Sequence, residues 1–186
     1  IAMASSGLHS NGFSLVRHIL AARGIGYHDE LPEFGGVVGQ TLLTPTALYT
    51  APLLDTLAEL PGAIHALSHV TGGGIAANLA RVLPVGSWVE VDRGSWSPPA
   101  VFRVLADLAG DSLESTEGTW NLGLGMLAVV AHDSASSVIR ALESRGVPAW
   151  VAGRVSTAAH DLTGFEQGAK GVNGGAVKLV GSFASS

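Results

Sequence analysis

Short apolar runs alternate along this chain with segments in which apolar residues recur every three or four positions. An apolar run bounded by turn residues is typical of a buried strand, whereas the wider spacing is typical of a helix that buries one face. Val16, Ile19 and Leu20 keep the helical spacing, and Gly24 fits the end of that helix. The pattern predicts strands at residues 1–5, 63–70, 88–91, 124–130, 150–155 and 176–180.

Residues that favour helix starts precede several of the helical segments. The predicted helices begin at Phe13, Thr44-Pro45-Thr46, Ile75, Ser97-Pro98-Pro99 and Asp133. Asp133 is expected to cap its helix, and Pro52 is expected to kink the second helix or to delay its start. Glycine and proline predict a long loop over residues 25–43, and residues 158–175 are Gly-rich, polar and expected to be mobile.

The alternation of strands and helices is typical of a layered protein that contains both. The chain of 186 residues is long enough for one hydrophobic core, and it shows no internal repeat. We therefore expect a single domain spanning residues 1–186, of the α/β (α+β) class, with a central mixed β-sheet flanked by helices.

The amino-acid composition argues against several classes of function. Only 13% of residues are charged, the net charge is −5 and no basic run occurs, so a nucleic-acid surface is not expected. The absence of Cys excludes disulfides, Cys-ligated zinc and a thiol nucleophile, and it suits a cytoplasmic protein. No apolar stretch reaches the roughly 18–20 residues that a membrane span needs. Because the chain starts inside an apolar run without an initiating Met, we expect it to be part of a longer protein.

The first strand is followed by SSGLHSNG, residues 5–12, just before a predicted helix. Backbone N–H groups at a helix start favour an anion, and Gly7 and Gly12 allow a ligand to approach the backbone closely. Ser10 and Asn11 can form hydrogen bonds, and His9 can exchange a proton near neutral pH. Because Ser and Asn are also common capping and turn residues, the spacing alone favours a capped turn over a binding site.

A second loop, Thr71-Gly72-Gly73-Gly74, also precedes a predicted helix. Three consecutive glycines are entropically unfavourable, so either an anion-binding nest or close packing of helix against sheet is expected to require them. The pattern matches neither GxxxxGK[ST] nor GxGxxG, and it leaves both explanations open.

Other candidates are weaker. His65 and His69 lie four residues apart near a strand end, but no carboxylate follows them closely enough to suggest a metal site. No GxSxG pattern supports a serine nucleophile. Trp120 is expected in the core, and the role of Asn121 is left open.

Five stretches together carry a more specific signal. They are ASSGLHSNGFSLVR, LLTPTALY, SHVTGGGIAANLARVLP, SWSPPAVFRVL and TWNLGLGM. In this order, and over residues 1 to about 180, they resemble the C-terminal domain of phosphoribosylformylglycinamidine cyclo-ligase, also called aminoimidazole ribonucleotide synthetase. The chain departs from the family's pattern at Ala47, Ala51, Ala77, Ala80 and Ser115, which bears on the details of substrate contacts.

The resemblance implies an enzyme of purine biosynthesis. Members of the family use ATP and Mg²⁺ to close the imidazole ring of formylglycinamidine ribonucleotide. They pair an N-terminal domain, which dimerises and supplies most ATP and Mg²⁺ contacts, with a C-terminal α/β domain, and the active site lies between the two. Because the chain has no DGVGTK-like segment of the kind found in the N-terminal domain, we expect it to be inactive alone and to need its own N-terminal domain as partner in a homodimer.

The resemblance and the chemistry of the loops suggest the same site. Ser10, Asn11 and Gly12, the loop Thr71, Gly72, Gly73 and Gly74, and Asn121 are predicted to bind substrate or phosphate, and His9 to act as an acid/base or hydrogen-bonding group. Two kinds of alternative remain open. One is another enzyme of the superfamily: thiamin-monophosphate kinase, selenophosphate synthetase, the hydrogenase-maturation factor or formylglycinamidine synthetase. The other is a binding domain without catalytic activity.

Overall fold

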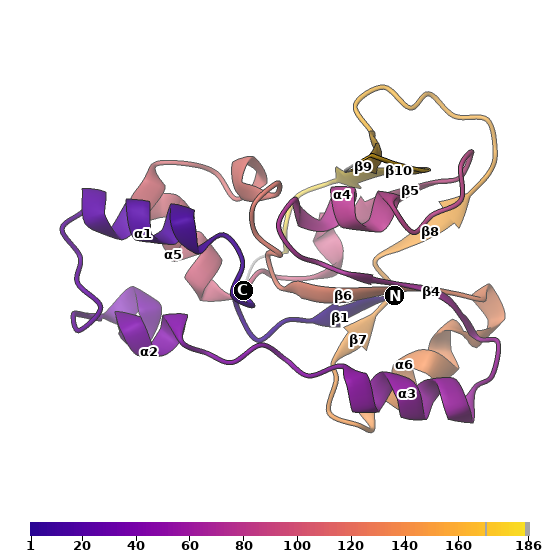
Figure 1. Cartoon of the computed structure of the whole chain (residues 1–186), viewed down its shortest axis with the longest axis horizontal. Coiled ribbons are helices and arrows are strands. Elements are labelled where there is room, and N and C mark those ends of the chain that lie inside the picture. The colour runs from indigo at the N-terminus through magenta and orange to yellow at the C-terminus, as the bar shows by residue number, and fades with distance from the viewer. Residues whose placement is uncertain (170, 185–186) are drawn as a thin grey trace.

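The computed structural model describes residues 1–169 and 171–184, and eight of the described strands form two four-stranded sheets (Figure 1). The first sheet, antiparallel throughout, has the order β4 (Ile64–His69), β6 (Leu124–Val130), β1 (Ala2–Ala4) and β7 (Ala149–Trp150). The second sheet has the order β8 (Gly153–Ser156), β5 (Trp88–Asp92), β10 (Val172–Val180) and β9 (Glu166–Ala169). It is mixed, because β5 and β10 are parallel whereas the outer pairs are antiparallel.

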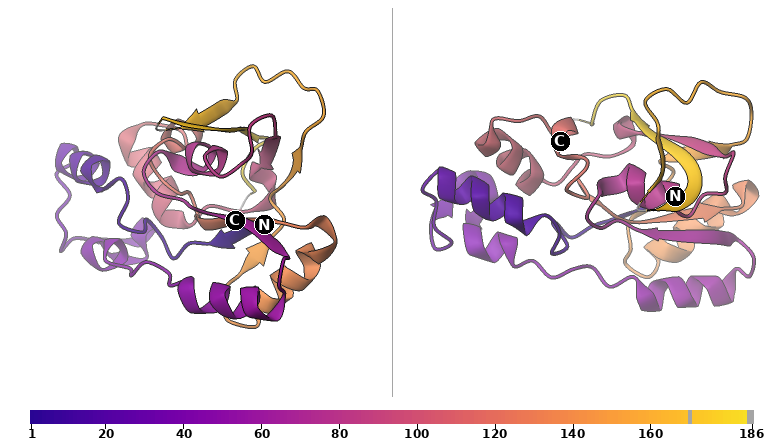
Figure 2. Two further views of the ribbon diagram at one scale, coloured as in Figure 1. Left: turned by 45° about the vertical axis from the view of Figure 1, so that its right-hand side comes forward. Right: turned by 45° about the horizontal axis from the view of Figure 1, so that its top comes forward.

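Helices cover the sheets in layers (Figures 1 and 2). Helix α4 (Gly74–Ala80) packs between the two sheets, and α3 (Thr50–Glu59) and α6 (Ala135–Glu143) cover the opposite face of the first sheet. Helices α1 (Phe13–Ala22), α2 (Val38–Leu42) and α5 (Ala100–Ala109) form a separate lobe at one end. Within the described residues, no helix is long and apolar enough to cross a bilayer.

The alternation of side chains along β1 divides the core into layers. Ala2 packs between the two sheets, whereas its neighbour Met3 packs under α3 and α6, and both are fully buried. Successive side chains of a strand point to opposite faces, so a strand buried on both faces reads as a continuous apolar run. The same holds for Leu127 and Ala128 of β6, which explains why both strands could be recognised from the sequence.

The α/β class is confirmed, but the expected single central mixed sheet is corrected: the described strands form two large sheets, of which the second is mixed, and a small hairpin. The predicted strand over residues 150–155 is in fact two strands. Trp150 ends β7 in the first sheet, and Gly153 begins β8 in the second. Ala152, which connects β7 to β8, is buried among the residues that fill the space between the two sheets. The sequence therefore stays apolar where the chain crosses from one sheet to the other.

Two segments predicted as loops contain regular structure. Residues 25–43 include β2 (Glu30–Leu31), β3 (Gly36–Val37), a short 3₁₀ helix and α2. These elements are too short to show a period, but Phe34, Val38 and Leu42 are buried in the helical lobe. Residues 158–175 include β9 and the start of β10, which pair with each other as an antiparallel hairpin, and Lys170 lies outside the described residues.

The delayed start allowed for the second helix is confirmed, and the predicted cap of α6 is wrong. The second helix begins at Thr50 rather than at residues 44–46, which places Pro52 in the first turn, where a missing N–H is tolerated. Asp133 lies in a 3₁₀ turn, and Ser134 occupies the capping position of α6 without a side-chain hydrogen bond.

One ion pair joins the second sheet to the loop that packs on α4. The guanidinium of Arg93 donates two hydrogen bonds to the carboxylate of Glu117, at 2.5 and 2.8 Å, and others to the carbonyls of Leu179 and Gly181. The side chains of Arg93 and Glu117 are only 15% and 18% exposed. A pair this buried leaves an uncompensated charge when one partner is removed.

We therefore predict that Arg93→Met lowers the free energy of unfolding by about 2–4 kcal/mol. The matched control is Arg145→Met, because Arg145 pairs with Asp55 and Glu59, whose side chains are 68% and 53% exposed. That change should cost less than about 1 kcal/mol. Urea denaturation of both variants measures the difference, and equal losses would contradict the role assigned to Arg93.

Candidate functional site

The predicted loops gather at one edge of the first sheet. Strands β1 and β4 are both antiparallel to β6, so they run in the same direction and end where β6 begins. Two hydrogen bonds fix the loops there: the N–H of Ser5 donates to the carbonyl of Gly123 at 2.8 Å, and the N–H of Val70 donates to that of Gly125 at 3.0 Å. Residues 5–12, 71–74 and 121–123, far apart in the sequence, therefore lie around the start of one strand.

The loop of residues 5–12 has an unusual backbone. His9 and Ser10 adopt left-handed conformations with φ of 52° and 60°, and Gly12 follows with φ of 69°. A non-glycine residue in this region costs about 1–3 kcal/mol and persists only where its surroundings enforce it. The side-chain amide of Asn11 donates to the carbonyl of His9 at 2.9 Å, and Ser10 is exposed.

Helix α1 starts without a side-chain cap. Gly12 occupies the capping position, and no side chain hydrogen-bonds to the helix start there. The side-chain cap of the capped-turn explanation is therefore absent, whereas its turn is present, because the N–H of Asn11 donates to the carbonyl of Leu8 at 3.1 Å. Uncapped N–H groups at a helix start are suited to an anion. A Cβ at Gly12 would lie 2.5 Å from the indole nitrogen of Trp120, which is fully buried, so the helix start rests on this ring. The core position predicted for Trp120 is confirmed.

His9 is buried, with 5% of its surface exposed, and its two ring nitrogens have different surroundings. Nε2 accepts hydrogen bonds from the backbone N–H groups of Ser6, at 3.0 Å, and Ala47, at 3.2 Å. Nδ1 is buried without a hydrogen-bond partner. Because an imidazole nitrogen that accepts cannot carry a proton, the neutral ring holds its proton on Nδ1.

The surroundings of His9 favour the neutral ring. Burial lowers the pKa of His9 below its usual 6.5, and the nearby His69 lowers it further. His69 is itself exposed, on the edge strand β4. At neutral pH the arrangement therefore presents an uncharged imidazole with one N–H, at Nδ1, that no other group uses.

Asn121 holds the first loop in place. Its side-chain oxygen accepts from the hydroxyl of Ser5 at 3.0 Å and from the N–H of Gly123 at 2.8 Å, and its amide donates to the carbonyl of Gly7 at 2.8 Å. The residue is only 1% exposed. The structure thus gives Asn121 a positioning role within the site, and direct contact of its side chain with a ligand stays a prediction.

The second loop combines packing with a hydrogen-bonded turn. The N–H of Gly74 donates to the carbonyl of Thr71 at 3.1 Å, and the hydroxyl of Thr71 donates to Asn78 at 3.2 Å. A Cβ at Gly74 would overlap the carbonyl of Glu117, so this glycine is required for close approach of the two backbones. A Cβ at Gly72 would meet nothing within 4 Å, which leaves that side of the loop open.

Sequence reasoning missed two residues that organise the second loop. Asn78, 1% exposed, donates from its amide to the carbonyls of Thr71 and Gly74, and Arg81 donates to its side-chain oxygen. The Nε of Arg81 is buried without a partner. Their spacing of three on one helix face, directly after the glycines, was the signal that could have identified them.

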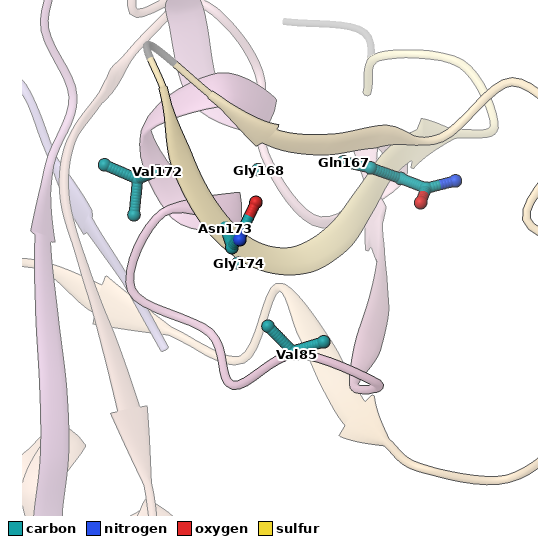
Figure 3. A pocket seen from close by; sticks show the side chains of 6 residues that line it. All are labelled: Val85, Gln167, Gly168, Val172, Asn173 and Gly174. Carbon is teal, nitrogen blue, oxygen red and sulfur yellow. The ribbon is translucent and has the colours of Figure 1, made fainter.

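Two cavities have linings that include none of the loop residues 5–12, 71–74 and 121–123. The larger of two cavities, about 320 Å³, lies beside the β9–β10 hairpin, with Val85 facing the hairpin (Figure 3). The smaller, about 170 Å³, is lined by residues that include Ala4, Ala47 and Tyr49. Among the described residues, no group of three His, Cys, Asp or Glu side chains could hold a metal ion.

The fold and the site together define a class of protein. It is a layered α/β domain whose glycine-rich strand-to-helix loops gather at one edge of a sheet. The sequence model of the family described as "AIR synthase related protein, C-terminal domain" matches residues 1–165, and the chain belongs to this family. The resemblance read from the five sequence stretches is confirmed.

Similar proteins carry the corresponding name. The chain is 45% identical to a protein of Streptomyces fradiae, provisionally named phosphoribosylformylglycinamidine cyclo-ligase, over 99% of this chain and 96% of that protein. It is 46% identical to the phosphoribosylformylglycinamidine cyclo-ligase of Sorangium cellulosum, over 83% of this chain. It is 38% identical to that of Pseudothermotoga lettingae, again over 83%. The chain spans only 45% of the length of each of these last two relatives.

The packing of the second loop gives a test. Gly74→Ala is expected to lower the free energy of unfolding by about 2–4 kcal/mol, because the new Cβ overlaps Glu117 and φ at this position is +73°. Gly72→Ala, two residues away in open space, should change it by less than about 1 kcal/mol. Urea denaturation distinguishes the two, and a Gly74→Ala variant as stable as the wild type would show that the loop does not depend on this contact.

Proposed function

We propose that the chain supplies the substrate-binding half of a phosphoribosylformylglycinamidine cyclo-ligase, a ligase of purine biosynthesis. The observation that carries the proposal is the gathering of residues 5–12, 71–74 and 121–123 around the start of β6. The names of the relatives favour this activity over the other enzymes of the superfamily.

The proposed reaction suits these loops. ATP phosphorylates the formyl-derived oxygen of formylglycinamidine ribonucleotide, the neighbouring nitrogen attacks the same carbon to close the ring, and inorganic phosphate leaves. The ribonucleotide substrate, ADP and inorganic phosphate are all anionic. Phosphoryl transfer is catalysed mainly by positioning and charge stabilisation. The uncapped start of α1 offers N–H donors to such groups, and Arg81 adds a cation beside the second loop.

Within this proposal, Ser10, Asn11 and Gly12 bind the phosphate or the adjoining part of the substrate, together with Thr71, Gly72, Gly73 and Gly74. His9 acts through Nδ1, because Nε2 is already engaged by two backbone N–H groups. An uncharged imidazole donating from Nδ1 is suited to hydrogen-bonding a substrate oxygen.

ATP and Mg²⁺ are assigned to another part of the enzyme. The longer relatives contain a further half that this chain does not match, and we propose that it is the N-terminal domain, which binds ATP and Mg²⁺, dimerises and closes the site in a cytoplasmic enzyme. The similar length of the Streptomyces fradiae protein keeps one alternative open, a domain that binds the ribonucleotide without catalysis.

The proposal predicts that the 186-residue chain binds formylglycinamidine ribonucleotide in a titration calorimeter but forms no ADP when ATP and Mg²⁺ are added. The control ligand is the dephosphorylated nucleoside. It should bind at least about tenfold more weakly, because charge-assisted hydrogen bonds to the phosphate are lost.

The possible results of this titration distinguish between the proposed functions. ATP-dependent ring closure by the pure chain would show that no further domain is needed. Equal affinity for ribonucleotide and nucleoside would overturn the assignment of the loops to phosphate, and binding without activity after addition of the N-terminal domain would favour the binding domain.

A further inference from the structure

Residues 44–49, called here the strap, connect α2 to α3 without forming a helix or strand. Three hydrogen bonds attach the strap to the end of β1 and its loop. The hydroxyl of Ser6 donates to the carbonyl of Pro45 at 2.6 Å, the N–H of Ala47 donates to Nε2 of His9 at 3.2 Å, and the hydroxyl of Tyr49 donates to the carbonyl of Ala4 at 2.6 Å. The strap therefore borders the proposed site along its length.

His9 is the side chain that joins the loop and the strap. Its Nε2 accepts one N–H from each of them, from Ser6 in the loop and from Ala47 in the strap. The hydroxyl of Ser6 is also 3.0 Å from Nε2, but its proton is directed to Pro45. Two donors on one nitrogen leave no room for a proton there.

Strand β6 determines the space in which the ring of His9 lies. A Cβ at Gly125 would overlap the hydroxyl of Tyr49 and would lie 2.6 Å from Cε1 of His9. The rings of His9 and Tyr49 lie 6.0 Å apart, tilted by 58°. The absence of a side chain at Gly125 thus lets both rings rest on the strand, and the left-handed backbone of His9 turns its ring toward them.

We infer that His9 is a positioning residue whose neutral imidazole holds the strap against the SSGLHSNG loop by accepting hydrogen bonds at Nε2. This pair of hydrogen bonds is called here the clasp. The inference rests on the proposed function only for the identity of the ligand that the site receives. Its test reads the conformation of the strap directly, so a failure of the cyclo-ligase proposal would not decide it.

The clasp predicts a dependence on pH. Protonation of Nε2 would place a donor against the N–H groups of Ser6 and Ala47, so the strap should be released when His9 becomes charged. Within the described residues, His69 of β4 acts electrostatically on the ring and the ring of Tyr49 lies 6.0 Å from it, and neither side chain is an anion that would favour the charged imidazole. Because the pKa of His9 is lowered on folding, the contribution of the clasp is fully present above the unfolded value of 6.5 and is lost as pH falls through the lowered value.

Amide hydrogen exchange of the full 186-residue chain tests the inference. The protection factor of the Ala47 N–H should fall about fivefold, the equivalent of one hydrogen bond, between about pH 7.5 and about pH 4.5. His9→Asn tolerates the left-handed backbone but is too short to reach the strap, so it should show the low protection at both pH values. His9→Gln keeps an acceptor oxygen that does not titrate, so it should restore protection and remove the pH dependence.

The matched control is His18→Ala, which removes an exposed histidine of α1 and should leave the exchange of Ala47 unchanged. Nitrogen NMR of the His9 ring at about pH 7.5 should show the proton on Nδ1. A proton on Nε2, a pH-independent Ala47 in the wild type, or full protection in His9→Asn would each overturn the clasp. Should His9→Asn be unstable, the comparison of the wild type with His9→Gln still decides the pH dependence.

Discussion

Strand β6 pairs antiparallel with both β1 and β4, and this pairing decides where the candidate site lies. Two strands that flank a third in the antiparallel sense must run in the same direction, so their following loops emerge at one edge. Without β6 between them, residues 5–12 and 71–74 would have no reason to be neighbours. Residues 121–123 reach the same edge because they lead directly into β6, and Asn121 uses that position to hold Gly7 and Ser5.

Close backbone approach is the second constraint, and it operates at several glycines around this edge. Gly12 rests on Trp120, Gly74 on the carbonyl of Glu117, and Gly125 under Tyr49 and His9. In each case a single Cβ would push apart two segments that are distant in the sequence. These glycines therefore bring distant segments together, whereas a Cβ at Gly72 would meet nothing within 4 Å.

The sequence was informative where a pattern is local. Strand β6 was predicted with its observed bounds, and helix α1 was predicted from Val16, Ile19 and Leu20, because each buries side chains at its own regular period. The division into two sheets was not predictable from residues 150–155, since the crossing residue Ala152 is as apolar as the strands it separates. Likewise Asn121 could only be left open, because its partners Ser5 and Gly7 lie more than a hundred residues away.

The chemistry of His9 illustrates the same limit. The sequence indicates a histidine beside a helix start, which fits a proton-transfer group, but it gives no means of distinguishing the two ring nitrogens. The fold distinguishes them: Ser6 and Ala47 donate to Nε2, which places the proton of the neutral ring on Nδ1, a buried nitrogen without a hydrogen-bond partner. The contact that organises the strap is therefore also the contact that selects the tautomer, so a loss of the clasp would change the chemistry of the ring together with its position. The orientation of this ring and its tautomer depend on one pair of backbone hydrogen bonds.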